Sequence, residues 1–155
     1  MDVTPVIHNT FVIERSYPVA PQKVFAAFSD PAKKRRWMGG DADGFEIVSF
    51  EMDFRVEAFE RWSFRFQGGD LIKSDFCYKD IVPNTRIVAV YTMEFGDKRV
   101  SSSQVTVEFL SAGQGTTLRH TEQGAFFDGT DQSAGREHGT RGLLEELAKE
   151  IERAN

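Results

Sequence analysis

The alternation of apolar and polar residues between positions 45 and 123 most constrains the fold of this chain. A period of two is the pattern of a half-buried β-strand. Turn residues at 68–70, 83–84, 96–97 and 113–115 divide the alternation into segments. We expect six strands, at about 45–52, 54–67, 71–81, 86–95, 99–110 and 116–123. Because no helical stretch separates them, they should form one antiparallel meander.

One further strand and two short helices are predicted ahead of this meander. Residues 9–17 alternate and indicate a strand. Pro21 suits the first turn of a helix. Asp30 followed by Pro31 signals a second helix start, and we expect that helix to reach about Met38, before two glycines end it.

The last predicted element is a long helix over about 131–153, with a leucine stripe that includes Leu143. Three glycines, Gly135, Gly139 and Gly142, fall on one side of it beside that stripe. Each costs about 1 kcal/mol relative to alanine inside a helix. Such a face permits close backbone approach or leaves room for a ligand. The alternative is a frayed or broken helix start.

Length and aromatic content indicate one domain, spanning 1–155. A chain of 155 residues can bury roughly 68–70 per cent of its unfolded surface, so its core needs no metal or disulfide. The chain has 14 phenylalanines, besides 3 tyrosines and 2 tryptophans. So many rings must either pack tightly together or surround something apolar.

Charge and cysteine content exclude several classes. The single cysteine, Cys77, forms no internal disulfide, so a cytoplasmic location is expected. No signal peptide and no apolar run near the roughly 18 residues of a membrane span is found. A net charge of −5 opposes general attraction to nucleic acid or anionic lipid. The basic run at 33–36 is the local exception, and we interpret it as the solvated face of a short helix.

Six short motifs follow one another along the chain. They read VAPQKVF at 19–25, DP at 30–31 with Trp37, DFRV at 53–56, YKDIVP at 78–83 with Arg86, TLRHTE at 117–122 and REHGT at 136–140. In order and spacing they resemble the activator of HSP-90 ATPase homologue-like group of the SRPBCC superfamily, which includes START lipid-transfer domains, birch-pollen-allergen-like proteins and polyketide cyclases. The resemblance covers nearly the whole chain.

The resemblance implies an α+β helix-grip (START-like) fold. In that fold a curved antiparallel sheet, here of about seven strands, wraps a long C-terminal helix, and two short helices follow the first strand. It also implies a cavity between sheet and helix. Two departures from the family pattern add side chains beside that cavity: Glu57 and Ala58 stand in place of two glycines, and Phe76 stands in place of a third.

Alternation and the resemblance together select the residues expected to bind a ligand in this cavity. They are Phe25, Phe28, Phe76, Tyr78, Tyr91, His120, Glu122, Phe127, Arg136, Thr140 and Leu143. The two tyrosines would be polar points in an apolar wall, or they pack across strands.

Three of these residues carry candidate chemistry. His120 and Glu122 share the inner face of their strand with Leu118, and a histidine beside a carboxylate can orient a ligand or transfer protons. A structural hydrogen-bonded pair, or a solvated strand end, is the alternative. Arg136 can bind a ligand carboxylate or phosphate, or it caps the surface. The three histidines and Cys77 show no clustering, so neither a metal nor a cofactor is expected.

Three functions are consistent with these expectations. The leading hypothesis is binding of a small apolar or amphipathic molecule. The second is a polyketide cyclase-like enzyme that uses His120, Glu122 or Tyr78 for proton transfer. The third is a co-chaperone that stimulates a heat-shock chaperone ATPase, which the family name suggests. In this superfamily the fold does not fix the function. No nucleic-acid partner and no membrane span are expected, and a homodimer is left open.

Overall fold

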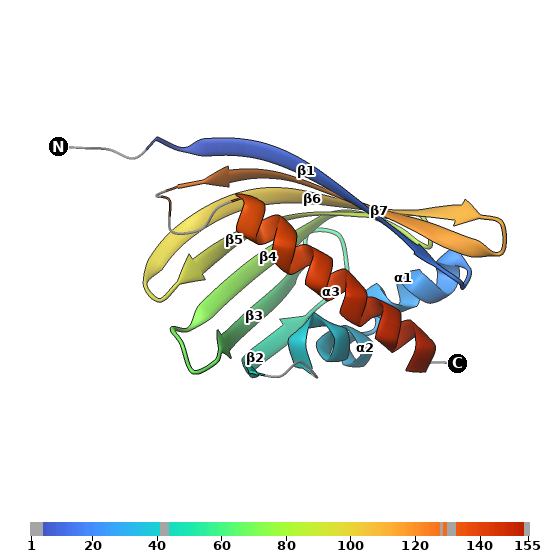
Figure 1. Cartoon of the computed structure of the whole chain (residues 1–155), viewed down its shortest axis with the longest axis horizontal. Helices are drawn as coiled ribbons and strands as arrows, with labels where there is room; N and C mark the ends of the chain where they lie inside the picture. Colours follow the sequence, from blue (N-terminus) through green and yellow to red (C-terminus); the bar gives the residue numbers. More distant parts are fainter. Residues whose placement is uncertain (1–4, 41–43, 128, 130–132, 154–155) are drawn as a thin grey trace.

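The fold is a single seven-stranded antiparallel sheet that curves around a long helix (Figure 1). The computed structural model describes residues 5–40, 44–127, 129 and 133–153. The strands are β1 (Ile7–Tyr17), β2 (Phe45–Met52), β3 (Phe59–Phe66), β4 (Ile72–Val82), β5 (Arg86–Phe95), β6 (Lys98–Ala112) and β7 (Gly115–Phe126). The helices are α1 (Pro21–Ser29), α2 (Pro31–Arg35), a short π-helical turn η1 (Arg36–Gly40) and α3 (Ser133–Arg153). This is the predicted helix-grip fold.

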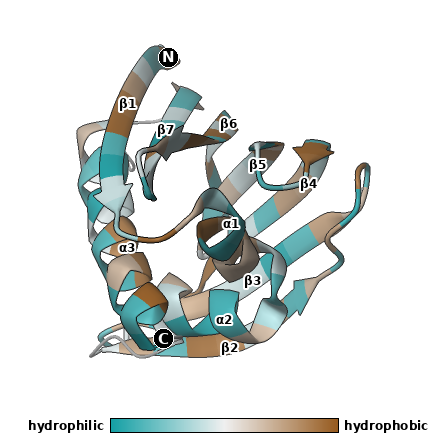
Figure 2. Ribbon diagram, turned by 90° about the vertical axis from the view of Figure 1, so that its right-hand side faces the viewer, coloured by the Kyte–Doolittle hydropathy of each residue, from teal (hydrophilic) through white to brown (hydrophobic). Residues whose placement is uncertain are grey.

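Strand order explains how the sheet is built. Hairpins join β2 through β7 in sequence order, and β1 pairs with β7, giving the order β1-β7-β6-β5-β4-β3-β2. In Figure 2 the strands follow one another along an arc, from β1 to β2, with the helices on the concave side. The predicted alternation of β1 is confirmed, since Phe11, Ile13 and Tyr17 are buried against the helices.

One predicted strand is too long. The segment 54–67 was expected to be a single strand, but β3 begins only at Phe59. The preceding residues form a tight loop, in which Ala58 N–H donates to the Arg55 carbonyl and Glu57 adopts a left-handed φ of 68°. A left-handed residue cannot continue a strand, so the regular register with β4 begins at Phe59, opposite Cys77. The bounds of β2 and β5 are as predicted, and the other strand boundaries differ by at most three residues.

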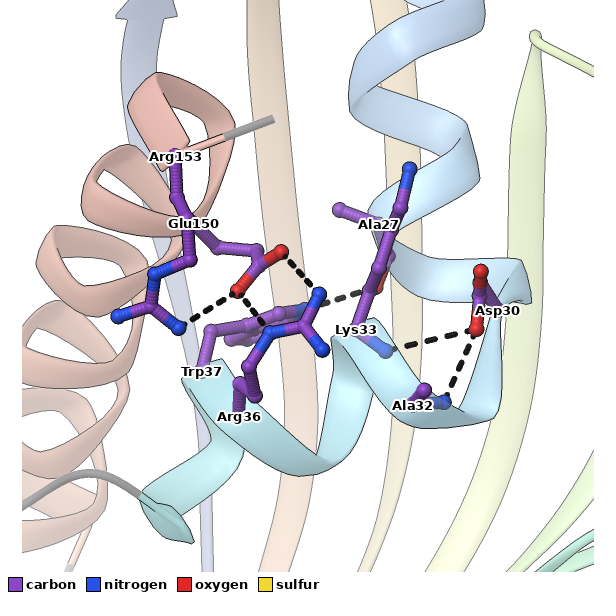
Figure 3. Close-up of polar contacts among 8 residues, drawn as sticks. All are labelled: Ala27, Asp30, Ala32, Lys33, Arg36, Trp37, Glu150 and Arg153. Carbon is purple, nitrogen blue, oxygen red and sulfur yellow. Dashed lines mark hydrogen bonds and ion pairs between the residues drawn. The ribbon is translucent and has the colours of Figure 1, made fainter. Parts of the chain in front are cut away.

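Both short helices begin where the sequence predicts, and the second one ends earlier than predicted. Asp30 caps α2, accepting hydrogen bonds from the backbone N–H groups of Ala32 and Lys33 at 2.9 and 3.4 Å (Figure 3). The regular helix ends at Arg35 rather than near Met38, and the π-helical turn η1 follows. Inside that turn the Trp37 indole donates to the Ala27 carbonyl at 2.8 Å, which ties η1 to α1.

The basic run at 33–36 is not simply a solvated face, as was expected. Arg36 forms a two-pronged ion pair with Glu150 of α3, at 2.8 Å on each arm, and Arg153 approaches the same carboxylate (Figure 3). Lys34 is buried and pairs with Glu60. Two of the four cations therefore join the short helices to other elements.

α3 is one continuous helix over the described residues from Ser133 on; positions 131 and 132 of the predicted helix lie outside the described residues. Its buried residues include Leu144, Leu147 and Ile151, so the leucine stripe faces the sheet. In the described part of the chain, no helix combines the length and the apolar character that crossing a membrane requires.

Candidate functional site

An apolar groove of about 590 Å³ lies between α3 and the half of the sheet formed by β2 to β5. Its strand side consists mainly of aromatic rings. These are Phe45, Trp62, Phe64, Phe66, Phe76, Tyr91 and Phe95. Many of the phenylalanines therefore surround an open volume rather than fill the core.

The helix side of this groove is the glycine face. Gly135, Gly139 and Gly142 all line it, and a Cβ added at any of them would meet no atom within 4 Å beyond its chain neighbours and the adjacent helix backbone. These glycines therefore do not serve to bring another backbone close to the helix. They leave open space beside it, and the helix is continuous through all three.

A smaller cavity of about 110 Å³ lies deeper, under the middle of α3. It adjoins the groove, because both are lined by Met38, Phe76, Tyr91, Thr140 and Leu143. Both walls are mainly apolar, but Arg136 and Glu146 also line the groove. The deeper cavity meets Lys34, Glu60, His120 and Glu122. The site is thus mainly apolar, with a group of ionisable side chains at its inner end.

A buried ionic cluster crosses the inner end between β5, β7 and α3. Tyr91 donates to Glu122 Oε2 at 2.7 Å, and Arg136 Nη1 lies 2.6 Å from the Tyr91 hydroxyl and 3.2 Å from the same carboxylate oxygen. The other arm of Arg136 donates to Ser101 at 2.7 Å. Arg136 was expected to bind a carboxylate or phosphate of the ligand. In the structure its guanidinium pairs instead with the carboxylate of Glu122.

This cluster fixes the protonation of its members. Burial opposes ionisation of Glu122, but His120, Arg136 and Tyr91 outweigh it and hold the pKa of that carboxyl below its ordinary value. Burial, reinforced by the Glu122 charge, raises the pKa of Tyr91 far above its ordinary range. Glu122 is thus an ion and Tyr91 a neutral donor at physiological pH.

His120 lies beside this cluster without a hydrogen bond to it. Its Nε2 is buried and lies 3.6 Å from Glu122 Oε1, beyond hydrogen-bond distance, and makes no hydrogen bond to any residue that the structure describes. The ring stacks on Phe11 at a centroid distance of 6.1 Å and lines the inner cavity. Alternation therefore predicted correctly that His120 and Glu122 face inward together.

A second buried cluster, centred on Glu60, was not predicted. Glu60 Oε1 accepts from Lys34 Nζ at 2.8 Å and from the Tyr78 hydroxyl, and Oε2 accepts from the Trp62 indole at 2.6 Å. Burial, followed by the Glu60 charge, raises the pKa of Tyr78 far above its ordinary range. The inner cavity thus meets two carboxylates, each with a tyrosine and a cation of its own.

Nine of the eleven predicted site residues line the groove or the inner cavity, and two do not. Phe25 packs edge-on against Phe54 and Phe109 in the core between α1 and the sheet. Phe127 follows β7, where its backbone N–H bonds the Val100 carbonyl. Whether the nine residues bind a ligand stays a prediction.

The departures from the family pattern affect the cavity less than expected. Glu57 points to solvent and pairs with Lys79 at 3.2 Å, and neither it nor Ala58 lines the groove or the inner cavity. Phe76 does line both, stacked on Tyr91 at 4.3 Å. Only the Phe76 departure therefore reduces the space.

The charges of this site are balanced. Lys34 pairs with Glu60, Arg136 with Glu122, and Glu146 at the groove with Lys149 at 3.0 Å. Within the described residues, no group of three or more His, Cys, Asp or Glu side chains could hold a metal ion. The arrangement suits a mainly apolar molecule without a net charge.

Comparison with known proteins agrees with this architecture. The family model described as Activator of Hsp90 ATPase homolog 1-like protein matches residues 18–152. A protein from Rhizobium loti, known from a crystal structure, is 51% identical in sequence. The match covers 95% of this chain and 99% of that protein's chain, with a TM-score of 0.87. A protein from Rhizobium leguminosarum is 36% identical over 96% and 97%, with a TM-score of 0.89.

A more distant structure, from Chromobacterium violaceum, is 25% identical over 93% of this chain and 97% of its own, with a TM-score of 0.78. No protein of curated function matches the chain.

Proposed function

The chain belongs to the Activator of Hsp90 ATPase homolog 1-like family of the SRPBCC superfamily, and we propose that it binds one small apolar or amphipathic molecule between its sheet and α3. The observation that carries the proposal is the groove of about 590 Å³ with its aromatic wall. Ligand sites are typically concave, mostly apolar and about 300–1,000 Å³ in volume, with a few polar groups that orient the ligand.

The polar groups of the inner cavity support an amphipathic ligand. They lie at one end of a continuous apolar space, so a ligand would enter with its polar end first. Glu60 and Glu122 are tied by hydrogen bonds that hold their side chains in place. Such preorganisation reduces the entropic cost of binding. With a single cysteine, Cys77, the protein needs no oxidising compartment, and we place it in the cytoplasm.

A neutral fluorescent probe tests this function. N-phenyl-1-naphthylamine should bind saturably to the wild-type protein with one site per chain. Gly142→Leu puts a side chain into the groove and should weaken binding at least about tenfold, which corresponds to 1.4 kcal/mol. His138→Leu is the matched control, because it adds a leucine at an exposed position of the same helix that does not line the groove.

Equal binding by both variants would reject the groove as the site. Absence of saturable binding to the wild-type protein, across a panel of neutral apolar molecules, would reject the function. Native mass spectrometry of protein purified from its own cells would then identify the class of any retained molecule.

One observation favours enzymatic proton transfer as a second candidate. His120 lines the cavity beside an ionised carboxylate, and its Nε2 makes no hydrogen bond to the described residues. Tyr78 is a poorer candidate, because its raised pKa keeps it protonated. If a substrate is found, His120→Ala should lower turnover about 10²–10⁴-fold and change affinity by less than about tenfold. Unchanged turnover would reject His120 as acid or base.

No comparable observation favours the co-chaperone. Among the described residues, the large exposed apolar side chains of the strands are Ile7 and Val12 on β1, Val48 on β2 and Phe66 on β3. β1 is one edge of the sheet, and β2 with its neighbour β3 lies at the other. These side chains therefore fall at opposite ends of the strand order, whereas a docking surface is expected to be one continuous patch.

A further inference from the structure

The inner cavity contains one polar ring whose hydrogen-bonding capacity is unused within the described residues. Tyr78, Tyr91, Glu60 and Glu122 all have partners there. His120 lines the same cavity, is largely buried, and has no hydrogen bond to a residue that the structure describes. A buried polar group without a partner costs free energy. That cost falls on Nε2; the other ring nitrogen likewise has no hydrogen bond to a described residue, and a ligand group could supply one to it.

The neighbouring carboxylate determines what kind of group can bind. Glu122 Oε1 lies 3.6 Å from Nε2 of His120, and its pKa is held low, so it is an ion. A negative charge beside Nε2 favours the tautomer with its proton on that nitrogen. The other ring nitrogen then carries a lone pair. The complementary ligand group is therefore a hydrogen-bond donor.

The charge balance of the site disfavours a ligand group that carries a charge. The cations Lys34 and Arg136 already pair with Glu60 and Glu122. A ligand carboxylate would enter without a free counter-charge, and a ligand ammonium would compete with Lys34 and Arg136 for carboxylates that they already hold. Buried unpaired charges are strongly disfavoured. The donor should consequently be neutral, and a hydroxyl is the simplest such group.

From these observations we propose that the ligand is a neutral, largely aromatic or otherwise flat apolar molecule that carries a hydroxyl group, and that this hydroxyl donates a hydrogen bond to His120. The proposal rests on the proposed binding function. The aromatic rings of the groove would contact the apolar body, since stacked and edge-on ring contacts favour other rings. The hydroxyl would occupy the inner cavity.

Three probes of one shape test the role of the hydroxyl. Naphthalene has no polar group, 1-methoxynaphthalene has an acceptor oxygen without a donor, and 1-naphthol has the donor. Calorimetric titration of the wild-type protein should show 1-naphthol binding about three- to tenfold more tightly than 1-methoxynaphthalene, the net value of one hydrogen bond. 1-Naphthoate, which is ionised at neutral pH, should bind more weakly than 1-naphthol.

Two phenylalanine variants locate the partner of the hydroxyl. His120→Phe keeps a ring against Phe11 but removes both nitrogens, and it should abolish the preference for 1-naphthol while naphthalene still binds. His8→Phe changes an exposed histidine of β1 and should retain the preference. If His120→Phe does not fold, His120→Leu takes its place in this test. The comparison of the three probes on the wild-type protein requires no variant.

The outcomes separate this inference from the function on which it rests. Equal affinity for 1-naphthol and 1-methoxynaphthalene, or a preference that survives in His120→Phe, would overturn the role of the hydroxyl while binding to the groove stands. Failure of all three neutral probes to bind would overturn the binding function and this inference together.

Discussion

Lys34 Nζ lies 2.8 Å from Glu60 Oε1 in the interior of the protein, where the two side chains are 9% and 1% exposed. The lysine belongs to a five-residue helix and the glutamate to a strand, so this ion pair fastens α2 to the concave face of the sheet. Tyr78 and Trp62 complete the bonding of the carboxylate. A fully bonded buried carboxylate of this kind is a structural part of the cavity wall.

Removal of Lys34 should therefore be costly. Lys34→Met leaves Glu60 buried with a charge but no cation, and should lower the free energy of unfolding by about 3–5 kcal/mol. Urea denaturation measures this. Arg35→Met, at the exposed neighbouring position, is the control and should change stability by less than about 0.5 kcal/mol.

The double variant Lys34→Met with Glu60→Gln should recover part of that loss, because a neutral amide no longer needs the cation and its oxygen still accepts a hydrogen bond. Losses that simply add would show that the two residues are not coupled.

The fold was predictable because its signals are local. Alternation gave the strands, and a proline after a capping aspartate gave the start of α2. The loop before β3 was missed, because the left-handed Glu57 is no glycine and nothing in its residue type announces a turn. Hydrophobic patterns do not report a backbone conformation that tertiary contacts impose.

The site was only half predictable, for a related reason. His120 and Glu122 were found because Leu118 fixes the inward face of their strand. Glu60 could have been found in the same way, since it alternates with Trp62. Lys34 lies three residues before the buried Trp37 and so on the same helix face, but a basic run of four residues obscured that spacing. Which inward polar groups bond one another depends on the sheet curvature, which no short pattern encodes.

The three tyrosines of the chain should resist ionisation until the protein unfolds. Burial raises the pKa of Tyr17, Tyr78 and Tyr91 above the ordinary value. A raised folded-state pKa means that the stabilisation is complete below the ordinary tyrosine pKa of about 10 and is lost as the pH rises above it. Near-ultraviolet absorbance should therefore show tyrosinate appearing together with loss of circular dichroism. A tyrosine that titrates near pH 10 in the folded protein would contradict this.

Stability should also fall in acid through Glu122. Its folded-state pKa is lowered, so its stabilisation is present above the ordinary carboxyl pKa and is lost as the pH falls through that value towards the folded one. Between about pH 6 and 3 the unfolding free energy of Glu122→Gln should decline less steeply than that of the wild type, although the variant is less stable at pH 7. Glu152→Gln, at an exposed position, should retain the wild-type slope.

The open groove makes a prediction about Gly139 that does not depend on knowing the ligand. A Cβ at this position would meet no atom within 4 Å beyond its chain neighbours and the adjacent helix backbone, and the residue lies inside a continuous helix. Gly139→Ala should therefore raise the free energy of unfolding by about 0.4–1 kcal/mol, chiefly because alanine restricts the unfolded chain. Chemical denaturation of the ligand-free protein measures the change.

A second glycine provides the contrast for this measurement. A Cβ at Gly115 would lie 2.6 Å from the Tyr17 carbonyl oxygen, where the β1–β7 pairing begins, so Gly115→Ala should destabilise the protein by about 1–3 kcal/mol. Both variants add one methyl group, at Gly139 into open space and at Gly115 against a backbone carbonyl. Destabilisation by Gly139→Ala would mean that another part of the molecule covers the glycine face, and the groove would then not be open to a ligand from that side.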